Sequence, residues 1–463
     1  MLRILDRIPD LISPFTCLFA VTLPACSRHT KPLPDLPLEI WLEIFQWSTY
    51  VYGATTIGGM DPFTLQHSPT DVMGANTPIL AMRTKCALVL VCRSWRRIAI
   101  QILYQHIVIR SPSRAALILQ VLRASQSDKS DNYGYWTRHI EVFTHARGSS
   151  DIRFLQTVFR ILQYCPRLRM LSATWRVVVP REFLNAVSTL YGPTLQGLNW
   201  NEQKHSLDKT HASLDFLASF RSLRILDLRN FVGDGLLNRE GLPPATLPSL
   251  NHIILSNIGC NLVVATALEL PALHTLTLQS LVGHSTRIDL ITKLLQSHGA
   301  SLTTVHLPSP SSGADTEPYQ PRTPAQHIPP SLFLSAGVCP NLDTISFGAN
   351  SPPFTYEPTA MEPHAHPALR QIALLSVRAE ALYPSKGPNE TQTHLRSFTR
   401  TAYPQLEMVR TAGFLVDADT DSLLKDVFIW WSERFERDGV DFQDGEGVVW
   451  MYGDDGEESR GSC

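Results

Sequence analysis

Apolar residues recur along most of the chain in one short unit. A leucine anchor is followed by apolar residues three and five positions later, as in Leu223-x-x-Leu226-x-Leu228. Most spacings between anchors fall in the range of about 20–29 residues that is typical of leucine-rich repeats. Ile140 and Val142 open the series with a degenerate anchor. The anchors themselves are Leu168, Leu195, Leu223, Leu250, Leu273, Leu302, Leu342, Leu369 and, in a weaker copy, Leu406.

The parity of this unit predicts parallel strands. Residues three and five after the anchor point to the same side of a strand, and a single strand cannot bury that side alone. Strands stacked side by side bury it as a continuous ladder, and parallel neighbours need crossover segments. Helical spacing of apolar residues predicts such crossovers over 151–163, 211–220 and 288–298. The alternative is a non-repeating α/β domain whose strands begin with leucine.

The flanks of the series carry further elements. We expect a strand at 106–109 and a helix at 113–123 before the repeats. An amphipathic helix at 421–438 is expected to cap the open end, as repeat arrays require. A short strand is expected at 448–452, followed by an acidic tail. Pro-rich loops are expected at 308–330, 349–367 and 383–393.

Two further helices are predicted near the start. Pro37, Ile40, Trp41, Ile44 and Phe45 make one apolar face, after Asp35 as a helix cap. A second helix carries an apolar stripe, and more apolar residues lie off that stripe than one face can hold. So small a unit buries too little surface to be stable alone, so the rest of the chain or a partner must cover it. The alternative is a helical hairpin of an ordinary core. The stripe is Leu88, Val91, Trp95, Ile98 and Ile102, and the additional residues are Val89, Leu90 and Cys92.

These two segments, Leu-Pro-x-Glu-Ile-x-x-x-Ile-Phe and Val-Cys-x-x-Trp-x-x-Ile-Ala, resemble an F-box, here of the fungal type with a long insert at 46–84. The resemblance implies that matching residues pack together and against a Skp-type adaptor of a cullin–RING ubiquitin ligase. The implied adaptor-binding residues are Leu36, Pro37, Ile40, Ile44, Phe45, Val91, Cys92 and Trp95. The later series is similar to the degenerate leucine-rich repeats that follow the box in many such proteins.

The expected fold class is therefore α/β, with all-α F-box helices followed by an irregular leucine-rich-repeat solenoid. The expected parts are an apolar segment at 1–30, the box with its insert at 31–110, the solenoid at 111–415, and a capping helix with an acidic tail at 416–463.

Composition limits the kinds of partner and compartment that we expect for this chain. The formal net charge is −2, which favours neither nucleic acid nor an anionic membrane. The 8 cysteines are scattered without a C-x-x-C pair, which indicates no zinc site and a reduced compartment, cytoplasmic or nuclear. Residues 11–23 form an apolar run that is too short to span a bilayer and resembles part of a signal peptide.

Candidate chemistry is sparse, and we expect no enzyme, cofactor or metal. Gly283-His284-Ser285 lacks the second glycine of a nucleophile elbow. Asp417-x-Asp419-x-Asp421 lacks the glycine and glutamate of a calcium loop and is typical of a helix start. His364 and His366 lie in a Pro-rich loop.

Three functions remain open. The first is a substrate receptor of an SCF-type ubiquitin ligase, which binds the adaptor through the box and a target protein through the repeats. The second is a repeat scaffold without a ligase. The third is a secreted recognition protein, which would be cleaved near Ala25 and glycosylated at the Asn389 sequon.

Overall fold

A computed structural model describes residues 36–51, 63, 76–126, 132–149, 151–176, 178–202, 212–231, 245–281, 286–309, 327–334, 337–352, 366–383, 389–416 and 420–451. The chain divides into two compact units, each described by itself below. The first comprises 1–50, 78–137 and 143–166, and the second comprises 51–77, 138–142 and 167–463. The expected segments 1–30 and 454–463, and most of the insert, lie outside the described residues.

The first unit is almost entirely helical. Three helices near its start form a small cluster around Phe45, Ile98, Ala99 and Ile102. Its elements are α3 (Leu38–Ser48), α4 (Pro78–Val91), α5 (Arg93–Tyr104), β1 (His106–Ile109), α6 (Pro112–Gln126), α7 (Tyr133–Trp136) and α8 (Ile152–Tyr164).

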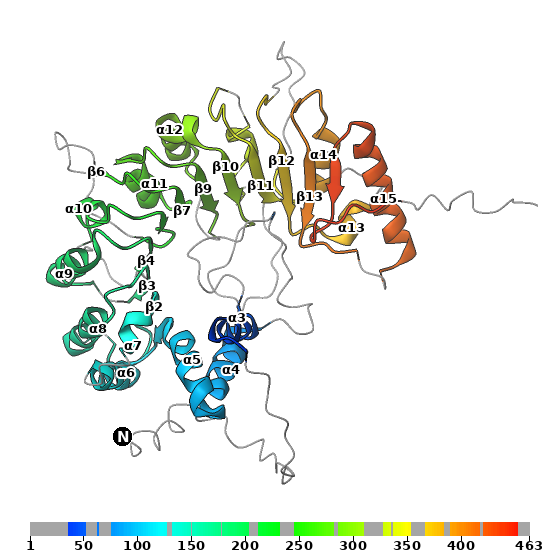
Figure 1. The fold of residues 1–463 in the computed structure, drawn as a ribbon. Helices are drawn as coiled ribbons and strands as arrows, with labels where there is room; N and C mark the ends of the chain where they lie inside the picture. Colours follow the sequence, from blue (N-terminus) through cyan, green and yellow to red (C-terminus); the bar gives the residue numbers. More distant parts are fainter. Residues whose placement is uncertain are drawn as a thin grey trace, which may run out of the picture. The chain divides into compact units, whose positions relative to one another are not determined.

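The second unit is built on one long parallel sheet, with helices along one of its faces (Figure 1). Its strands follow the order β2-β3-β4-β5-β7-β9-β10-β11-β12-β13-β14. They are β2 (His139–Phe143), β3 (Met170–Trp175), β4 (Gly197–Glu202), β5 (Ile225–Asp227), β7 (His252–Ser256), β9 (Thr275–Gln279), β10 (Thr304–Leu307), β11 (Thr344–Gly348), β12 (Gln371–Leu375), β13 (Met408–Ala412) and β14 (Asp441–Gln443).

The connecting segments carry helices and one small sheet. β6 (Ala245–Thr246) and β8 (Leu268–Glu269) pair in parallel. The helices are α9 (Arg181–Tyr191), α10 (Leu214–Ala218), α11 (Gly259–Thr266), α12 (Ile288–His298), α13 (Ala379–Leu382), α14 (Glu390–Ser397) and α15 (Ser422–Arg437), with 3-10 turns at Gly299–Ser301 and Pro330–Leu332.

The repeat unit predicts the sheet correctly. Each of the nine anchors is buried and is followed two residues later by the first residue of a strand. Residues three after the anchor stand opposite one another along the sheet, for example Leu198 with Leu226 and Ile253 with Leu276. Burial of each leucine contributes roughly 1.5–3 kcal/mol. Neighbouring repeats share this core, so the sheet is stable only as a stack.

A second buried ladder lies three residues before the anchors. Cys165, Phe220, Leu247, Cys339 and His366 occupy this position and are all buried. In two repeats this position is a glycine. A Cβ added to Gly192 would lie 2.7 Å from the Ser219 carbonyl oxygen, and a Cβ added to Gly299 would lie 2.3 Å from the Val338 carbonyl oxygen. Successive turns therefore approach one another so closely that this position accepts either glycine or a side chain directed into the core.

Four local predictions need correction. The stretch 88–102 is not one helix, because α4 ends at Val91 and α5 begins at Arg93. α4 also begins at Pro78, inside the segment that was assigned to the insert. Residues 448–451 form no strand, whereas the final strand is β14 at 441–443. The predicted helix at 211–220 shortens to α10, which Ser213 caps by accepting the Phe216 N–H.

Candidate functional site

The helices α3 and α5 pack through three aromatic rings. The ring centroids of Trp41 and Trp95 are 5.1 Å apart, those of Phe45 and Trp95 are 4.9 Å apart, and those of Trp41 and Phe45 are 5.7 Å apart. Tilted aromatic pairs at these distances each contribute roughly 0.5–1.5 kcal/mol beyond their buried area. The three rings therefore hold the small helical cluster together from inside.

The break between α4 and α5 is set by Cys92. Its backbone is extended, and its thiol accepts the Trp95 N–H at 3.4 Å, as an N-cap does. This hydrogen bond lowers the pKa of the exposed Cys92 thiol. The cap turns the chain so that α5 can bury Ile98 and Ile102 while the end of α4 remains open to solvent.

Helix α3 presents a second apolar face, next to the face that carries Trp41 and Phe45. Ile40 and Ile44 are each 42% exposed, and Trp47 continues their row at the next turn. In contrast, Phe45 is 2% exposed and Trp41 is half-buried. α3 is thus apolar on two adjacent faces, of which one is packed and the other is open.

Helix α4 likewise carries both exposed and packed apolar side chains. Leu90 is 69% exposed, and Ile79, Leu80, Met82 and Val91 are exposed as well. Leu88 and Val89, between these residues, pack on the aromatic cluster. We call the exposed side chains of both helices the open apolar face; it consists of Leu38, Ile40, Ile44, Trp47, Ile79, Leu80, Met82, Leu90 and Val91.

The structure places the eight predicted adaptor-binding residues in two groups. Phe45 is buried, and Leu36 and Trp95 are half-buried. The remaining five are exposed: Pro37, Ile40, Ile44, Val91 and Cys92. Trp47 and Ile79 were missed because both fall within the segment assigned to the insert. The helical spacing from Ile40 through Ile44 to residue 47 would have indicated Trp47.

A second row of side chains lies four residues after each anchor, on the sheet face opposite the leucine ladder, and most of these side chains are buried. Gln443 on β14, which has no anchor, extends the row by one strand because it stands opposite Arg410. Strand register sets them opposite one another in one continuous row. We call this the polar row; it consists of Ser172, Asn199, Asp227, Ile254, Thr277, His306, Ser346, Ala373, Arg410 and Gln443.

Hydrogen bonds link the polar row across strands. Within the row, His306 Nδ1 lies 2.8 Å from Ser346 Oγ. From outside the row, His252 Nε2 on β7 lies 2.9 Å from Thr277 Oγ1 on β9. Burial, with the nearby His306 and His274, lowers the pKa of His252 to about 4. Near neutral pH, His252 beside the row is therefore an uncharged hydrogen-bonding group.

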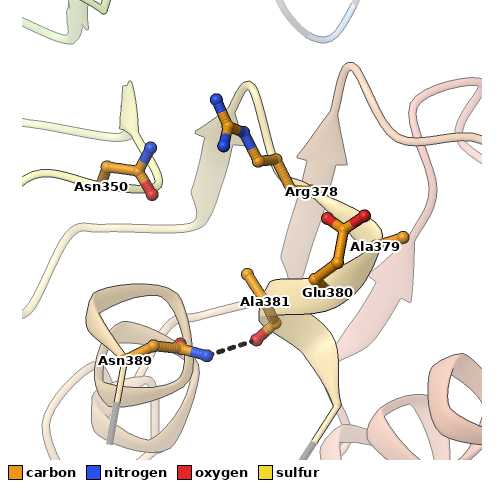
Figure 2. A pocket seen from close by; sticks show the side chains of 6 residues that line it. All are labelled: Asn350, Arg378, Ala379, Glu380, Ala381 and Asn389. Atoms are coloured by element: carbon orange, nitrogen blue, oxygen red, sulfur yellow. Dashed lines mark hydrogen bonds between the residues drawn. The ribbon is translucent and has the colours of Figure 1, made fainter. Parts of the chain in front are cut away.

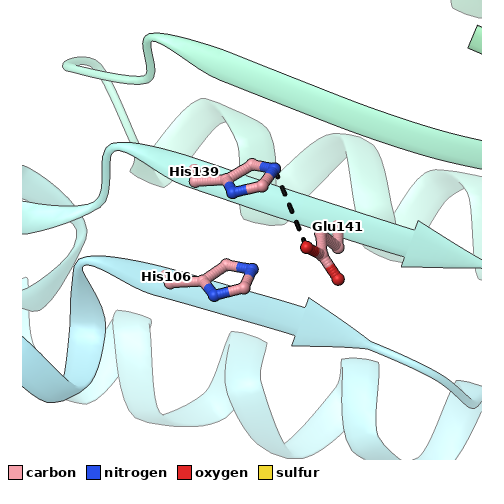
Figure 3. Close-up of side chains that lie close together, drawn as sticks. All are labelled: His106, His139 and Glu141. Atoms are coloured by element: carbon pink, nitrogen blue, oxygen red, sulfur yellow. Dashed lines mark ion pairs between the residues drawn. The ribbon is translucent and has the colours of Figure 1, made fainter. Parts of the chain in front are cut away.

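One end of the sheet repeats this pattern on β2. His139 Nε2 is 2.9 Å from Ser172 Oγ, and it lies 4.0 Å from Glu141 Oε1 on the same strand (Figure 3). These side chains extend the polar row by one strand.

A shallow recess lies beyond the ends of β11 and β12. It is lined by Asn350, Arg378, Ala379, Glu380, Ala381 and Asn389 (Figure 2). Asn389 Nδ2 donates to the Ala381 carbonyl at 2.9 Å, and Asn389 Oδ1 caps α14 by accepting the Gln392 N–H at 2.7 Å.

The histidine and aspartate candidates have structural roles where they are described. His366 is buried and its Nε2 lies 2.9 Å from the Cys339 carbonyl oxygen. Asp421 caps α15 through the Leu423 N–H. His364, Asp417 and Asp419 lie outside the described residues. Among the described residues, no helix combines the length and apolar character needed to span a bilayer.

Comparison with known proteins identifies no family for this chain. No family model matches the chain, and no curated protein matches it. A yeast structure of a Rad7 and Elc1 complex is similar over 88% of this chain and 92% of that chain, with 11% sequence identity and a TM-score of 0.31. We infer nothing about this protein from a likeness at that TM-score.

Proposed function

We propose that this chain is the substrate-recognition subunit of an SCF-type ubiquitin ligase. Its F-box-like helices dock on a Skp-type adaptor, and through it on a cullin, while the repeats bind a target protein. The observation that carries the proposal is the open apolar face of α3 and α4, which lies over a well-packed aromatic cluster.

This face supports docking because it costs free energy in water. Covering a side chain such as Ile40 or Leu90 contributes roughly 1.5–3 kcal/mol when burial is complete, and both are only partly buried now. Several such residues on two adjoining helices supply the apolar centre that a protein interface requires. The resemblance of the same helices to an F-box names the class of protein that covers them.

The mechanism is proximity. A receptor that holds a target beside the ubiquitin-loaded enzyme raises the effective concentration of the reacting groups. No residue of this chain performs covalent chemistry in this scheme. The polar row is the proposed target site, because its side chains follow one another along the sheet at a spacing of about 4.7–4.9 Å. Most of them are buried, so a target reaches them only by displacing the groups that cover them.

The test measures binding of the full-length chain to a purified Skp-type adaptor. Ile40→Glu combined with Ile44→Glu places two charges in the open apolar face while leaving the aromatic cluster intact. We expect affinity to fall by roughly 100-fold or more, because two contacts of hot-spot size are replaced by buried charges. Calorimetry or surface plasmon resonance measures the change.

The matched control is Ile288→Glu, which changes a residue 47% exposed on α12, outside this face. The control should bind the adaptor as the unchanged chain does. If the unchanged chain fails to bind the adaptor, or if the double variant binds equally well, the ligase assignment is wrong. A repeat scaffold without a ligase would then be the better account.

A further inference from the structure

Near one end of the polar row, the Arg410 guanidinium already binds a ligand-like group. Arg410 on β13 is buried, and its Nε and Nη2 both donate to Gln443 Oε1 on β14, at 3.2 and 2.7 Å. Its Nη1 donates to the main-chain carbonyl of Phe63 at 2.8 Å. The Phe63 ring lies with its centroid 5.5 Å from Arg410 Cζ, within the range of a cation–π contact.

The surroundings fix the guanidinium in this position. Gly447 has a φ of +83°, and a Cβ there would lie 2.6 Å from Arg410 Nη2. Glycine therefore provides the space that the guanidinium fills, and Gln443 fixes its plane. A buried arginine whose donors are aimed by two neighbours is pre-organised, so little conformational entropy is lost when it binds an acceptor.

Phe63 comes from the insert, 347 positions away in the sequence, and belongs to the same compact unit as β13. Its contacts with Arg410 include its backbone carbonyl and its aromatic ring. Neither feature is peculiar to this segment, because any extended peptide with an aromatic residue offers both. The contact therefore has the chemistry of peptide recognition rather than that of a side-chain core.

We infer that Arg410, Gln443 and Gly447 form a binding site for an extended peptide that carries an aromatic residue, and that Phe63 occupies this site as an intramolecular ligand. The inference rests on the proposed function, since it locates the target site within the polar row. A target must then displace Phe63, which belongs to the same chain and therefore competes as an intramolecular ligand. Only peptides that bind more strongly than Phe63, or are held nearby by a second contact, gain access.

The experiment uses a fluorescein-labelled peptide of residues 58–68 of this chain and the same peptide with Phe63→Ala. Each is titrated by fluorescence anisotropy into the full chain and into its Phe63→Ala variant. We expect the Phe63→Ala chain to bind the unchanged peptide at least about ten-fold more tightly than the unchanged chain does, because Phe63 no longer occupies the site. The alanine peptide should bind the variant at least ten-fold more weakly than the unchanged peptide.

The location is tested separately. In the Phe63→Ala chain, the unchanged peptide should slow hydrogen exchange at 408–412 and 441–443, a readout that needs no substitution of the buried arginine. Arg410→Lys in the same background keeps the charge but loses the planar fork, so peptide affinity should fall by about ten-fold. Thermal unfolding checks that this variant is folded, and the exchange result stands if it is not.

Two outcomes would overturn the inference. One is equal binding of the peptide by the full chain and by Phe63→Ala, and the other is no binding by either. Adaptor binding is measured on the same samples. Loss of adaptor binding with intact peptide binding would remove the ligase assignment alone, whereas the reverse would remove only the peptide site.

Discussion

The partly buried His252 should make this protein sensitive to mild acid. Its pKa in the folded chain is about 4, because burial first, and the neighbouring His306 and His274 second, disfavour its charged form. The unfolded chain restores the ordinary histidine pKa of about 6.5. Below pH 6.5 the unfolded state therefore binds more protons than the folded state, and stability falls as the pH is lowered towards 4.

The size of the effect follows from these two pKa values. Over the whole window, the difference corresponds to roughly 3 kcal/mol of stability that is present above pH 6.5 and lost by about pH 4. At pH 5, where the unfolded chain is almost fully protonated and the folded chain is not, the loss is about 2 kcal/mol. His298, His366 and His394 have pKa values lowered chiefly by burial, so they act in the same direction.

His252→Gln isolates this contribution. Glutamine is neutral at every pH and can still bond to the Thr277 hydroxyl, so the variant should lose less stability between pH 7 and pH 5 than the unchanged chain, by about 2 kcal/mol. Urea unfolding followed by tryptophan fluorescence at both pH values measures the difference. Parallel losses in the two proteins, or an NMR titration that places the His252 pKa near 6.5, would refute the reasoning.

Further expectations concern both units. Iodoacetamide should alkylate Cys92 in the native protein well before the buried Cys339, because the Trp95 N–H lowers the pKa of the first thiol and burial raises that of the second to about 12; peptide mass spectrometry reads the order. Trp95→Ala should destabilise the helical cluster by about 3 kcal/mol through lost aromatic contacts, and hydrogen exchange of α5 should accelerate. Arg229→Met should lower stability by about 2 kcal/mol in thermal unfolding, because the buried Asp227 carboxylate loses a partner 2.7 Å away.

Matched changes separate these effects from general damage. Arg287→Met breaks an ion pair with Asp289 in which both side chains are more than half exposed, so it should leave the melting temperature nearly unchanged. Trp430→Ala removes an exposed tryptophan from α15 and should not accelerate exchange in α5. A loss from Arg287→Met as large as that from Arg229→Met would show that burial of the carboxylate is not the cause.

The parallel sheet was predictable because its signal is repeated. Each copy places residues three and five after an anchor on one side, and nine copies agree on the same parity. The turns before the anchors also carried a signal that the leucine pattern obscures. Leu247-Pro-x-Leu250 and Cys339-Pro-x-Leu342 share a buried residue before proline, which defines the second ladder.

The helical surfaces were harder to predict. The apolar stripe from Leu88 to Ile102 continues across the break between α4 and α5. Its periodicity alone therefore predicts one helix. The extended backbone at Cys92 separates the two helices. β14 was missed because it has only three residues and no leucine anchor. The contact of Phe63 with Arg410 joins residues so far apart that no local pattern contains it.

The shortness of β14 has a consequence for solubility. A long parallel sheet that ended in a long flat strand would expose a row of unpaired amide and carbonyl groups, onto which another molecule could add a strand. Here the final strand has three residues. The chain then folds back on Asp444, whose carboxylate accepts the N–H groups of Glu446 and Val448 and the Trp450 indole N–H. This margin offers little template for fibre growth, and lengthening it by design would be a direct route to end-to-end polymers.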